Sequence, residues 1–378
     1  MPNLPISLYI HLPWCVRKCP YCDFNSHELK DSLPEELYVN ALLDELDTHL
    51  PLFQGRSLVS IFFGGGTPSL FSAHAIDRIL NGVDQHLSLG NHTEITLEAN
   101  PGTFEQERFR GFRSAGVNRL SIGVQSFQDH QLKTLGRIHD KHNAIHAISS
   151  ATKAGFDNFN IDLMYGLPNQ TIEDALSDIH TALSLQPKHV SWYQLTIEPN
   201  TLFYHQRPVL PQDDLLWEMQ LAGQEQLKTA GFQQYEVSAY ALPEKQCLHN
   251  LNYWQFGDYL GIGAGAHSKI TDIQTGKIVR FAQVKHPKDY LDKVKRHAQI
   301  KQPVSDHDVV FEFMLNALRL TDGIPLALFS ERTHLPLSII QSRLEEAKQK
   351  QFMIDDATHI RPTEHGKQFL NDFISLFL

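Results

Sequence analysis

The sequence predicts an α/β protein whose larger part is a partial barrel of parallel strands and whose smaller, C-terminal part is an α+β domain. Two observations lead to this prediction. Up to about residue 200, β-branched or aromatic runs alternate with amphipathic helical stretches roughly every 30 residues, which is typical of βα units on a parallel sheet. After residue 240 that rhythm fades, and the last part of the chain is mainly helical.

Six strands are expected, at residues 7–12, 58–63, 94–99, 119–124, 158–164 and 190–195. Between the first two, Ser32 and Glu35 form a capping-box pattern, which predicts a helix start there. A further helix is expected at 213–229, followed by a strand at 234–240. Because six βα units are fewer than the eight of a closed barrel, we expect an open, partial (β/α)6 TIM-like barrel.

The predicted domains are a barrel at 1–240, a barrel extension and connecting segment at 241–299, and a winged-helix-like domain at 300–378. The last domain should contain helices at 308–320, 325–333 and 338–349, a hairpin at 352–361 and a terminal helix. Winged helices often bind DNA through a basic surface, but the chain from residue 300 onward contains eight Lys and Arg and eleven Asp and Glu, a net negative charge. We therefore expect no nucleic-acid partner.

Composition restricts the other function classes. The chain has 33 Lys and Arg against 43 Asp and Glu, a formal net charge of −10, which gives no general attraction to polyanions or anionic lipid. No run of 18 apolar residues occurs, so no transmembrane segment is expected. Three of the four cysteines fall within eight positions, which indicates metal ligation in a reducing compartment, and the cytoplasm is the expected location.

Cys15, Cys19 and Cys22 have the spacing C-x3-C-x2-C and follow the first predicted strand. Thiolates are ligands for zinc and for iron–sulfur clusters. A structural zinc site would need a fourth ligand, for which His11 or His27 is available. Three thiolates on a cubane cluster would leave one iron free to bind a small molecule, and the glycine-rich segment at 64–68 after the second strand favours this alternative.

The cysteine spacing, with an aromatic residue before the last cysteine, and the GGGTP segment resemble the radical S-adenosylmethionine (SAM) superfamily. This resemblance implies one 4Fe-4S cluster on the three cysteines. It also implies that the open iron binds the amino and carboxylate groups of SAM, so that an electron from the reduced cluster can cleave the sulfonium.

A larger set of segments is similar to the branch of that superfamily that contains oxygen-independent coproporphyrinogen III oxidase, over nearly the whole chain. The segments are YIHLPWC, GGGTP, LEANP, GVQSF, LGRIH and IDLMYGLP. The resemblance implies that SAM contacts Tyr9, Gly65, Gly66, Thr67, Glu98, Gln125, Arg137 and Asp162. Carboxylates suit ribose hydroxyls, and Arg137 suits the methionine carboxylate. A structural role for each of these side chains is the alternative.

The chain departs from the oxidase pattern at Phe24, where that enzyme carries a fourth cysteine. Residues 249–254 instead match H-N-x-x-Y-W, which resembles the signature of the HemW family of heme chaperones. This implies that the protein binds heme through His249 and transfers it to acceptor proteins that the sequence does not identify. The alternatives are that His249 is a hydrogen-bonded structural histidine, and that the chain is a coproporphyrinogen III oxidase.

Two further segments have structural explanations. The glycines at 261–265 superficially match a dinucleotide loop, but no βα unit follows, so we expect them to allow close packing at the barrel mouth, with His267 as an outside candidate for a second iron ligand. The apolar C-terminal helix is expected to pack on the preceding helices; a dimer contact or a peripheral membrane contact is the alternative.

Overall fold

The computed structural model describes residues 4–102 and 105–378. All six predicted strands are present within two residues of their predicted bounds, and they lie side by side in chain order and parallel. They are β1 (Ile6–Leu12), β4 (Leu58–Gly65), β5 (Glu94–Ala99), β6 (Arg119–Gln125), β7 (Phe159–Tyr165) and β8 (His189–Gln194). The prediction of a partial parallel barrel is confirmed.

The sheet extends beyond these strands at both edges and reaches 12 strands in the described part of the chain. On one side β11 (Asp258–Ile262) runs parallel to β1, followed by antiparallel β12 (His267–Thr271), β13 (Ile278–Ala282) and β14 (Gln302–Pro303). On the other side, the strand predicted at 234–240 is wrong: the chain turns at 237–238 and forms the hairpin β9 (Gln233–Glu236) and β10 (Ala239–Ala241). No glycine, proline or asparagine marks that turn in the sequence.

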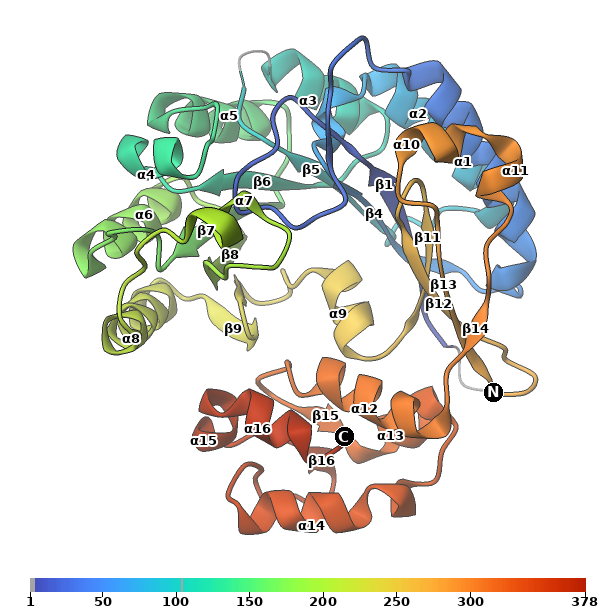
Figure 1. Ribbon diagram of the computed structural model, residues 1–378, viewed down its shortest axis with the longest axis vertical. Helices are drawn as coiled ribbons and strands as arrows, with labels where there is room; N and C mark the ends of the chain where they lie inside the picture. The colour runs from blue at the N-terminus through green and yellow to red at the C-terminus, as the bar shows by residue number, and fades with distance from the viewer. Residues whose placement is uncertain (1–3, 103–104) are drawn as a thin grey trace.

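Helices cover the convex side of the sheet, and the concave side faces the C-terminal part of the chain (Figure 1). The covering helices are α1 (Glu35–His49), α2 (Ala73–Leu87), α3 (Glu105–Ser114), α5 (Lys141–Lys153), α6 (Ile172–Ser184) and α8 (Asp213–Thr229). Shorter elements in the connections are β2 (Trp14–Cys15), β3 (His27–Glu28), η1 (Leu50–Phe53), η2 (Pro68–Leu70), α4 (Asp129–Thr134), α7 (Leu202–Gln206), α10 (Pro287–Leu291) and α11 (Lys293–Arg296).

Alternation along the strands separates the two faces of the sheet. On β1, Ile6, Leu8, Ile10 and Leu12 belong to the main hydrophobic core, whereas the residues between them, Ser7, Tyr9 and His11, make polar contacts. The barrel therefore has an apolar outer face under the helices and a polar inner face. One helix, α9 (Leu248–Trp254), occupies the opening on the concave side (Figure 1).

The capping box predicted at Ser32 is wrong. Helix α1 begins at Glu35 after Pro34, and no side chain caps it. The Glu35 carboxylate instead accepts a hydrogen bond from the Ser72 hydroxyl at 2.7 Å, at the start of α2. The acidic side chain thus links the first turns of two neighbouring helices, a partner that local sequence does not specify.

The C-terminal part lies below the barrel in Figure 1, and its apolar residues form a second core to which Phe256 and Ile278 of the barrel extension also contribute. It contains α12 (Asp306–Ala317), β15 (Ile324–Pro325), α13 (Leu326–Thr333), η3 (Leu337–Ile339), α14 (Gln341–Gln349), β16 (His359–Ile360), α15 (Glu364–Gln368) and α16 (Leu370–Ser375). The three predicted helices are present, but the hairpin at 352–361 is reduced to one bridge, because β16 pairs with β15 instead.

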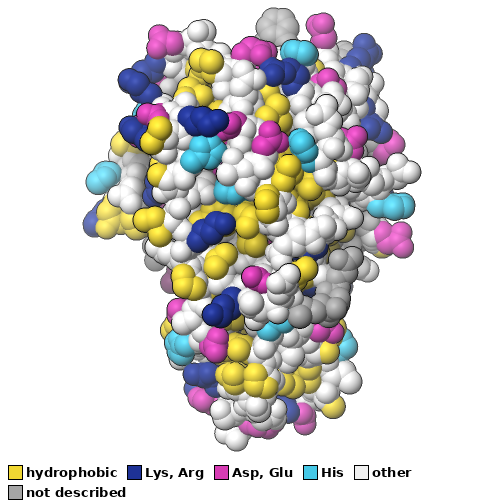
Figure 2. Space-filling model, turned by 90° about the vertical axis from the view of Figure 1, so that its right-hand side faces the viewer, with side chains coloured by type: hydrophobic (Ala, Val, Ile, Leu, Met, Phe, Trp, Pro, Cys, Tyr) yellow, Lys and Arg dark blue, Asp and Glu magenta, His cyan; other side chains and the backbone are white. Residues whose placement is uncertain are grey.

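The expected packing of the terminal helix is confirmed, although the helix is divided into α15 and α16. Phe373, Ile374 and Phe377 are buried in the second core, and Phe369 stays 42% exposed. Acidic and basic side chains are interspersed on the face of this domain seen in Figure 2. Within the described residues, no helix is both long enough and apolar enough to span a bilayer.

Candidate functional site

The three clustered cysteines lie on a loop that is closed at its base by a short parallel pairing. Trp14 and Cys15 in β2 pair with His27 and Glu28 in β3, and Cys15 O accepts a hydrogen bond from Leu29 N at 2.8 Å. Within the loop, Cys22 N donates to Cys19 O at 3.2 Å. The backbone therefore holds the cysteines on one compact turn at the end of β1.

Asn25, which the sequence pattern did not single out, anchors this loop to the glycine segment that follows β11. Its Nδ2 donates to Ala264 O at 2.9 Å and to Lys285 O at 2.8 Å, while its carbonyl O lies 2.8 Å from His11 Nε2. A Cβ on Gly265 would lie 2.2 Å from the Asn25 side chain. The expectation that these glycines permit close packing is confirmed.

A buried acid supports the same region from behind. Glu45 on α1 accepts hydrogen bonds from Gly263 N at 2.9 Å, Tyr290 Oη at 2.6 Å and Gln283 Nε2 at 2.8 Å. Burial raises the pKa of Glu45 despite these bonds. In the sequence Glu45 looks like any helical glutamate, so only the fold reveals its role in holding the mouth of the barrel.

The three thiols differ in burial, and as a set of three thiolates they suit a cubane cluster, in which each thiolate binds a different iron. Cys15 is buried, Cys19 and Cys22 are half-buried, and burial raises the pKa of Cys15 and of Cys22. Among residues 4–102 and 105–378, no three His, Cys, Asp or Glu side chains converge on a single metal-sized position. His11, one suggested fourth zinc ligand, has both ring nitrogens hydrogen-bonded.

The GGGTP segment lies against the base of the cysteine loop. Gly65 has a φ of 121°, and a Cβ there would lie 2.8 Å from the His11 ring, while a Cβ on Gly66 would lie 2.5 Å from Trp14 O. Thr67 N donates to Trp14 O at 2.7 Å, and Thr67 Oγ1 accepts from Asn100 Nδ2 at 2.9 Å. A side chain is excluded at Gly65 by the His11 ring and at Gly66 by the backbone of Trp14.

Two acids face the same space from β5 and β7. Burial and the neighbouring Asp162 raise the pKa of Glu98 to about 8, and burial raises the pKa of Asp162. Asp162 accepts from Asn160 Nδ2 at 2.7 Å and from Ser121 Oγ at 3.2 Å. Glu98 accepts only from Gly65 N, at 3.3 Å, among the described residues. The Glu98 carboxylate can therefore accept further hydrogen bonds from a ligand between β5 and β7.

Gln125 and Arg137 complete this wall. Gln125 has a φ of 73°, unusual for a residue with a side chain, at an irregularity in the β6–β7 pairing, and its Oε1 accepts from Tyr193 Oη at 2.7 Å. The Arg137 guanidinium donates to Asn100 Oδ1 at 2.6 Å and lies 3.7 Å from Cys19 Sγ. It therefore supplies positive charge beside the thiols.

These elements surround a cavity of about 960 Å³, which we call the cluster cavity. It brings together ten of the eleven residues predicted for the cluster and SAM: Cys15, Cys19, Cys22, Gly65, Gly66, Thr67, Glu98, Gln125, Arg137 and Asp162. Tyr9 is the exception. It lines a neighbouring cavity, and its hydroxyl lies 3.0 Å from His11 Nδ1.

His249 lies apart from the cluster cavity, on α9 inside the barrel. Its ring is fully engaged: Nδ1 lies 2.8 Å from Ser60 Oγ and Nε2 lies 2.9 Å from Tyr253 Oη. Burial, with a smaller contribution from Arg119, lowers the pKa of His249 to about 3, so the ring is neutral. In this conformation neither nitrogen is free to bind iron.

The start of α9 is fixed by a buried carboxylate on β5. Glu94 accepts from Leu248 N at 3.0 Å and from His249 N at 3.1 Å, and Arg119 Nε lies 4.0 Å away. The Cys247 thiol lies 3.3 Å from Glu94 Oε1, and burial raises its pKa to about 12. Such a thiol is protonated at neutral pH.

Comparison with known proteins identifies two families along the chain. Residues 9–182 match the radical SAM superfamily, and residues 304–369 match the HemN C-terminal domain. The heme chaperone HemW of Haemophilus influenzae is 50% identical over 100% of this chain and 99% of its own length. HemW of Escherichia coli is also 50% identical, over 99% of this chain and 98% of its own length.

Among solved structures, coproporphyrinogen III oxidase (HemN) of Escherichia coli is similar over 100% of this chain and 91% of its own chain, with a TM-score of 0.82. The sequence identity between the two is 23%. This likeness establishes the fold.

Proposed function

Since this chain belongs to the HemW family of radical SAM proteins, we propose that it is a heme chaperone that binds heme and delivers it to acceptor proteins. The observation that carries the proposal is the 50% identity with chaperones of that name over the full length of the chain. The free cysteines and the need for thiolates favour a reducing compartment, and we place the protein in the cytoplasm.

The cluster cavity fits a 4Fe-4S cluster with SAM beside it. Cys15, Cys19 and Cys22 would hold three irons, and Arg137 beside Cys19 would offset the negative charge of the thiolates. When bound, the cluster supplies an electron that can reduce the sulfonium of SAM. Glu98 and Asp162 are buried acceptors suited to ribose hydroxyls, and the glycine backbone at 65–66 allows a ligand to approach closely.

Heme ligation by His249 is a prediction that requires the Tyr253 side chain to move. A neutral imidazole is a suitable axial ligand, and burial keeps this ring neutral. Its Nε2 becomes available only when the Tyr253 hydroxyl, now 2.9 Å away, moves aside. Tyr253 lines the cavity that also contains Tyr9, which gives its ring space to move.

The decisive experiment titrates heme into the reconstituted protein, into His249→Ala and into His92→Ala. His92 is exposed and lies in a loop, so its variant controls for loss of a histidine. We expect a Soret band for wild type and His92→Ala and a shifted or weakened band for His249→Ala. A wild-type protein that binds no heme overturns the chaperone proposal. Wild-type behaviour of His249→Ala removes only that ligand.

Cluster binding is tested separately by anaerobic reconstitution. We expect a brown protein whose charge-transfer absorption is lost in Cys15→Ala, Cys19→Ala and Cys22→Ala, and whose reduced magnetic signal changes when SAM is added. Stoichiometric zinc without iron would refute the cluster. Incubation with SAM, reductant and coproporphyrinogen III should give no catalytic turnover, since Phe24 stands where the oxidase has a fourth cysteine.

A further inference from the structure

A second cavity, of about 770 Å³, lies between the cysteine loop, α9 and the inner face of the β11–β13 extension. We call it the extension cavity. Tyr259 on β11 pairs with Lys269 on β12, which pairs with Arg280 on β13, and His267 lies two residues before Lys269 on the same face. All four side chains line the cavity, so one face of three neighbouring strands forms its wall.

The deeper part of the extension cavity is aromatic. Tyr253 and Tyr259 meet edge to face with ring centroids 4.6 Å apart, and Tyr253 lies on the side of the cavity where His249 is buried. Tyr9, Trp254 and Phe256 add further rings to the lining. Flat aromatic surfaces of this kind suit a planar, largely apolar ligand.

The outer part is cationic. Lys18 and Lys285 are exposed at the rim and have no carboxylate partner among the described residues, where Lys18 donates only to the backbone O atoms of Phe24 and Ser26. Asp23 is the acid at the rim, and Glu98 lies deeper. Arg280 is already paired with Glu312, and Lys269 with Asp258, so among the described residues of the lining the two exposed lysines are the positive charges left for a ligand.

Three polar groups of the lining also lack partners. His27 Nε2 and Trp254 Nε1 are buried without a hydrogen bond, an arrangement that costs free energy unless a ligand or water satisfies it. The His267 ring makes no hydrogen bond with the described residues. It therefore differs from His249, whose two nitrogens are both engaged.

We propose, given the chaperone function above, that the extension cavity is the heme site, with the porphyrin against its aromatic rings, the propionates on Lys18 and Lys285, and His267 facing the iron. The volume lies within the range of about 300–1,000 Å³ common for small-molecule sites. Cys22, Gly65 and Glu98 line both cavities, so heme here lies next to the cluster and SAM.

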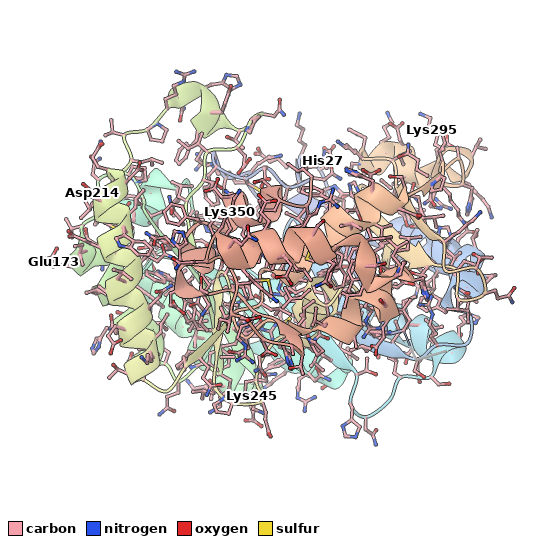
Figure 3. All side chains as sticks on the ribbon, turned by 90° about the horizontal axis from the view of Figure 1, so that it is seen from below. His27, Glu173, Asp214, Lys245, Lys295 and Lys350 are labelled. Atoms are coloured by element: carbon pink, nitrogen blue, oxygen red, sulfur yellow. The ribbon has the colours of Figure 1, made fainter. Side chains whose placement is uncertain are left out.

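The propionate contacts are tested with heme and heme dimethyl ester, which lacks the negative charges. Lys285→Gln and Lys18→Gln should each weaken heme binding about tenfold and leave ester binding unchanged, because one charge-assisted contact is lost. Lys285 is the cleaner position, since its side chain holds no part of the loop. Lys245→Gln is the control: Lys245 is exposed and lies across the molecule from His27 in Figure 3.

The iron ligand is tested by the Soret and ferric magnetic spectra of His267→Ala, with His92→Ala as the control and iron content as the measure of an intact cysteine loop. We expect His267→Ala to alter the heme spectrum and His92→Ala to leave it unchanged. If wild type binds heme while the lysine and His267 variants match it, the assignment of this cavity fails and the chaperone function stands. If wild type binds no heme, both fail.

Discussion

Replacing Asn25 by Ala should loosen the cysteine loop without touching a cysteine. The substitution removes two hydrogen bonds, at 2.9 Å and 2.8 Å, to carbonyls of Ala264 and Lys285, which are 239 and 260 residues away in the chain. At about 1 kcal/mol each, the loss is about 2 kcal/mol, or roughly a 30-fold increase in the population of the open loop. The cluster should therefore be lost faster, because it rests on that loop.

The assay is the rate at which a chelator removes iron from the reconstituted protein, measured with amide hydrogen exchange over residues 15–29. Asn81→Ala is the matched control, since it removes one exposed hydrogen bond to Asp77 at 3.0 Å within α2. Asn25→Ala should lose iron several-fold faster and exchange faster over the loop. Unchanged rates of both kinds would refute the idea that the glycine segment after β11 holds the cysteines in place.

Two further predictions concern the barrel. Gly65→Ala should abolish the effect of SAM on the cluster signal and cost about 2 kcal/mol or more in stability, because its Cβ would lie 2.8 Å from the His11 ring at a φ of 121°. Gly90→Ala is the control and should do neither, because its Cβ would make only an ordinary contact with Thr93 Oγ1 at 3.8 Å. An equal response of both variants would contradict this prediction. Burial raises the pKa of Asp178 from 3.8 to about 6, so the folded state binds this proton more tightly than the unfolded state does. Above pH 6 the ionised carboxylate therefore lowers the free energy of unfolding by up to about 3 kcal/mol, and this destabilisation decreases as the pH falls toward 4. Asp178→Asn should therefore flatten the dependence of unfolding free energy on pH between 4 and 6, as measured by urea denaturation; an unchanged slope would show that Asp178 is not the group that titrates.

Most of the barrel was predictable from the sequence. Each of the six parallel strands is a short run that must bury one face under helices, so its apolar residues are visible without any partner. That the cysteines and the glycine segment line one cavity was predictable for a related reason, since the cysteines lie within eight positions and the glycines in one segment. These patterns involve residues that are close in the chain, so they can be recognised in the sequence alone.

The contacts of Asn25 and Glu45 and the backbone conformation of Gln125 were not predictable in this way. Asn25 donates to carbonyl oxygens, and Glu45 accepts from a backbone amide, more than 200 residues away in the chain. Gln125 has a left-handed backbone conformation that its residue type does not favour. The pairing of β11 with β1 is equally distant in the chain. Long-range partners of this kind are chosen by the packing of the whole sheet.

His249 and His267 show most clearly which properties follow from the sequence and which follow from the fold. By itself the sequence determined that a histidine precedes Tyr253 and Trp254 in a recognisable motif, and that three thiols share one loop. Only the tertiary structure decided that His249 has both ring nitrogens occupied while His267 faces a cavity with cationic lysines at its rim. The physical reason is that the residue type determines which atom can bind a metal. Whether that atom is available to a ligand depends on which neighbours the fold brings within hydrogen-bond distance.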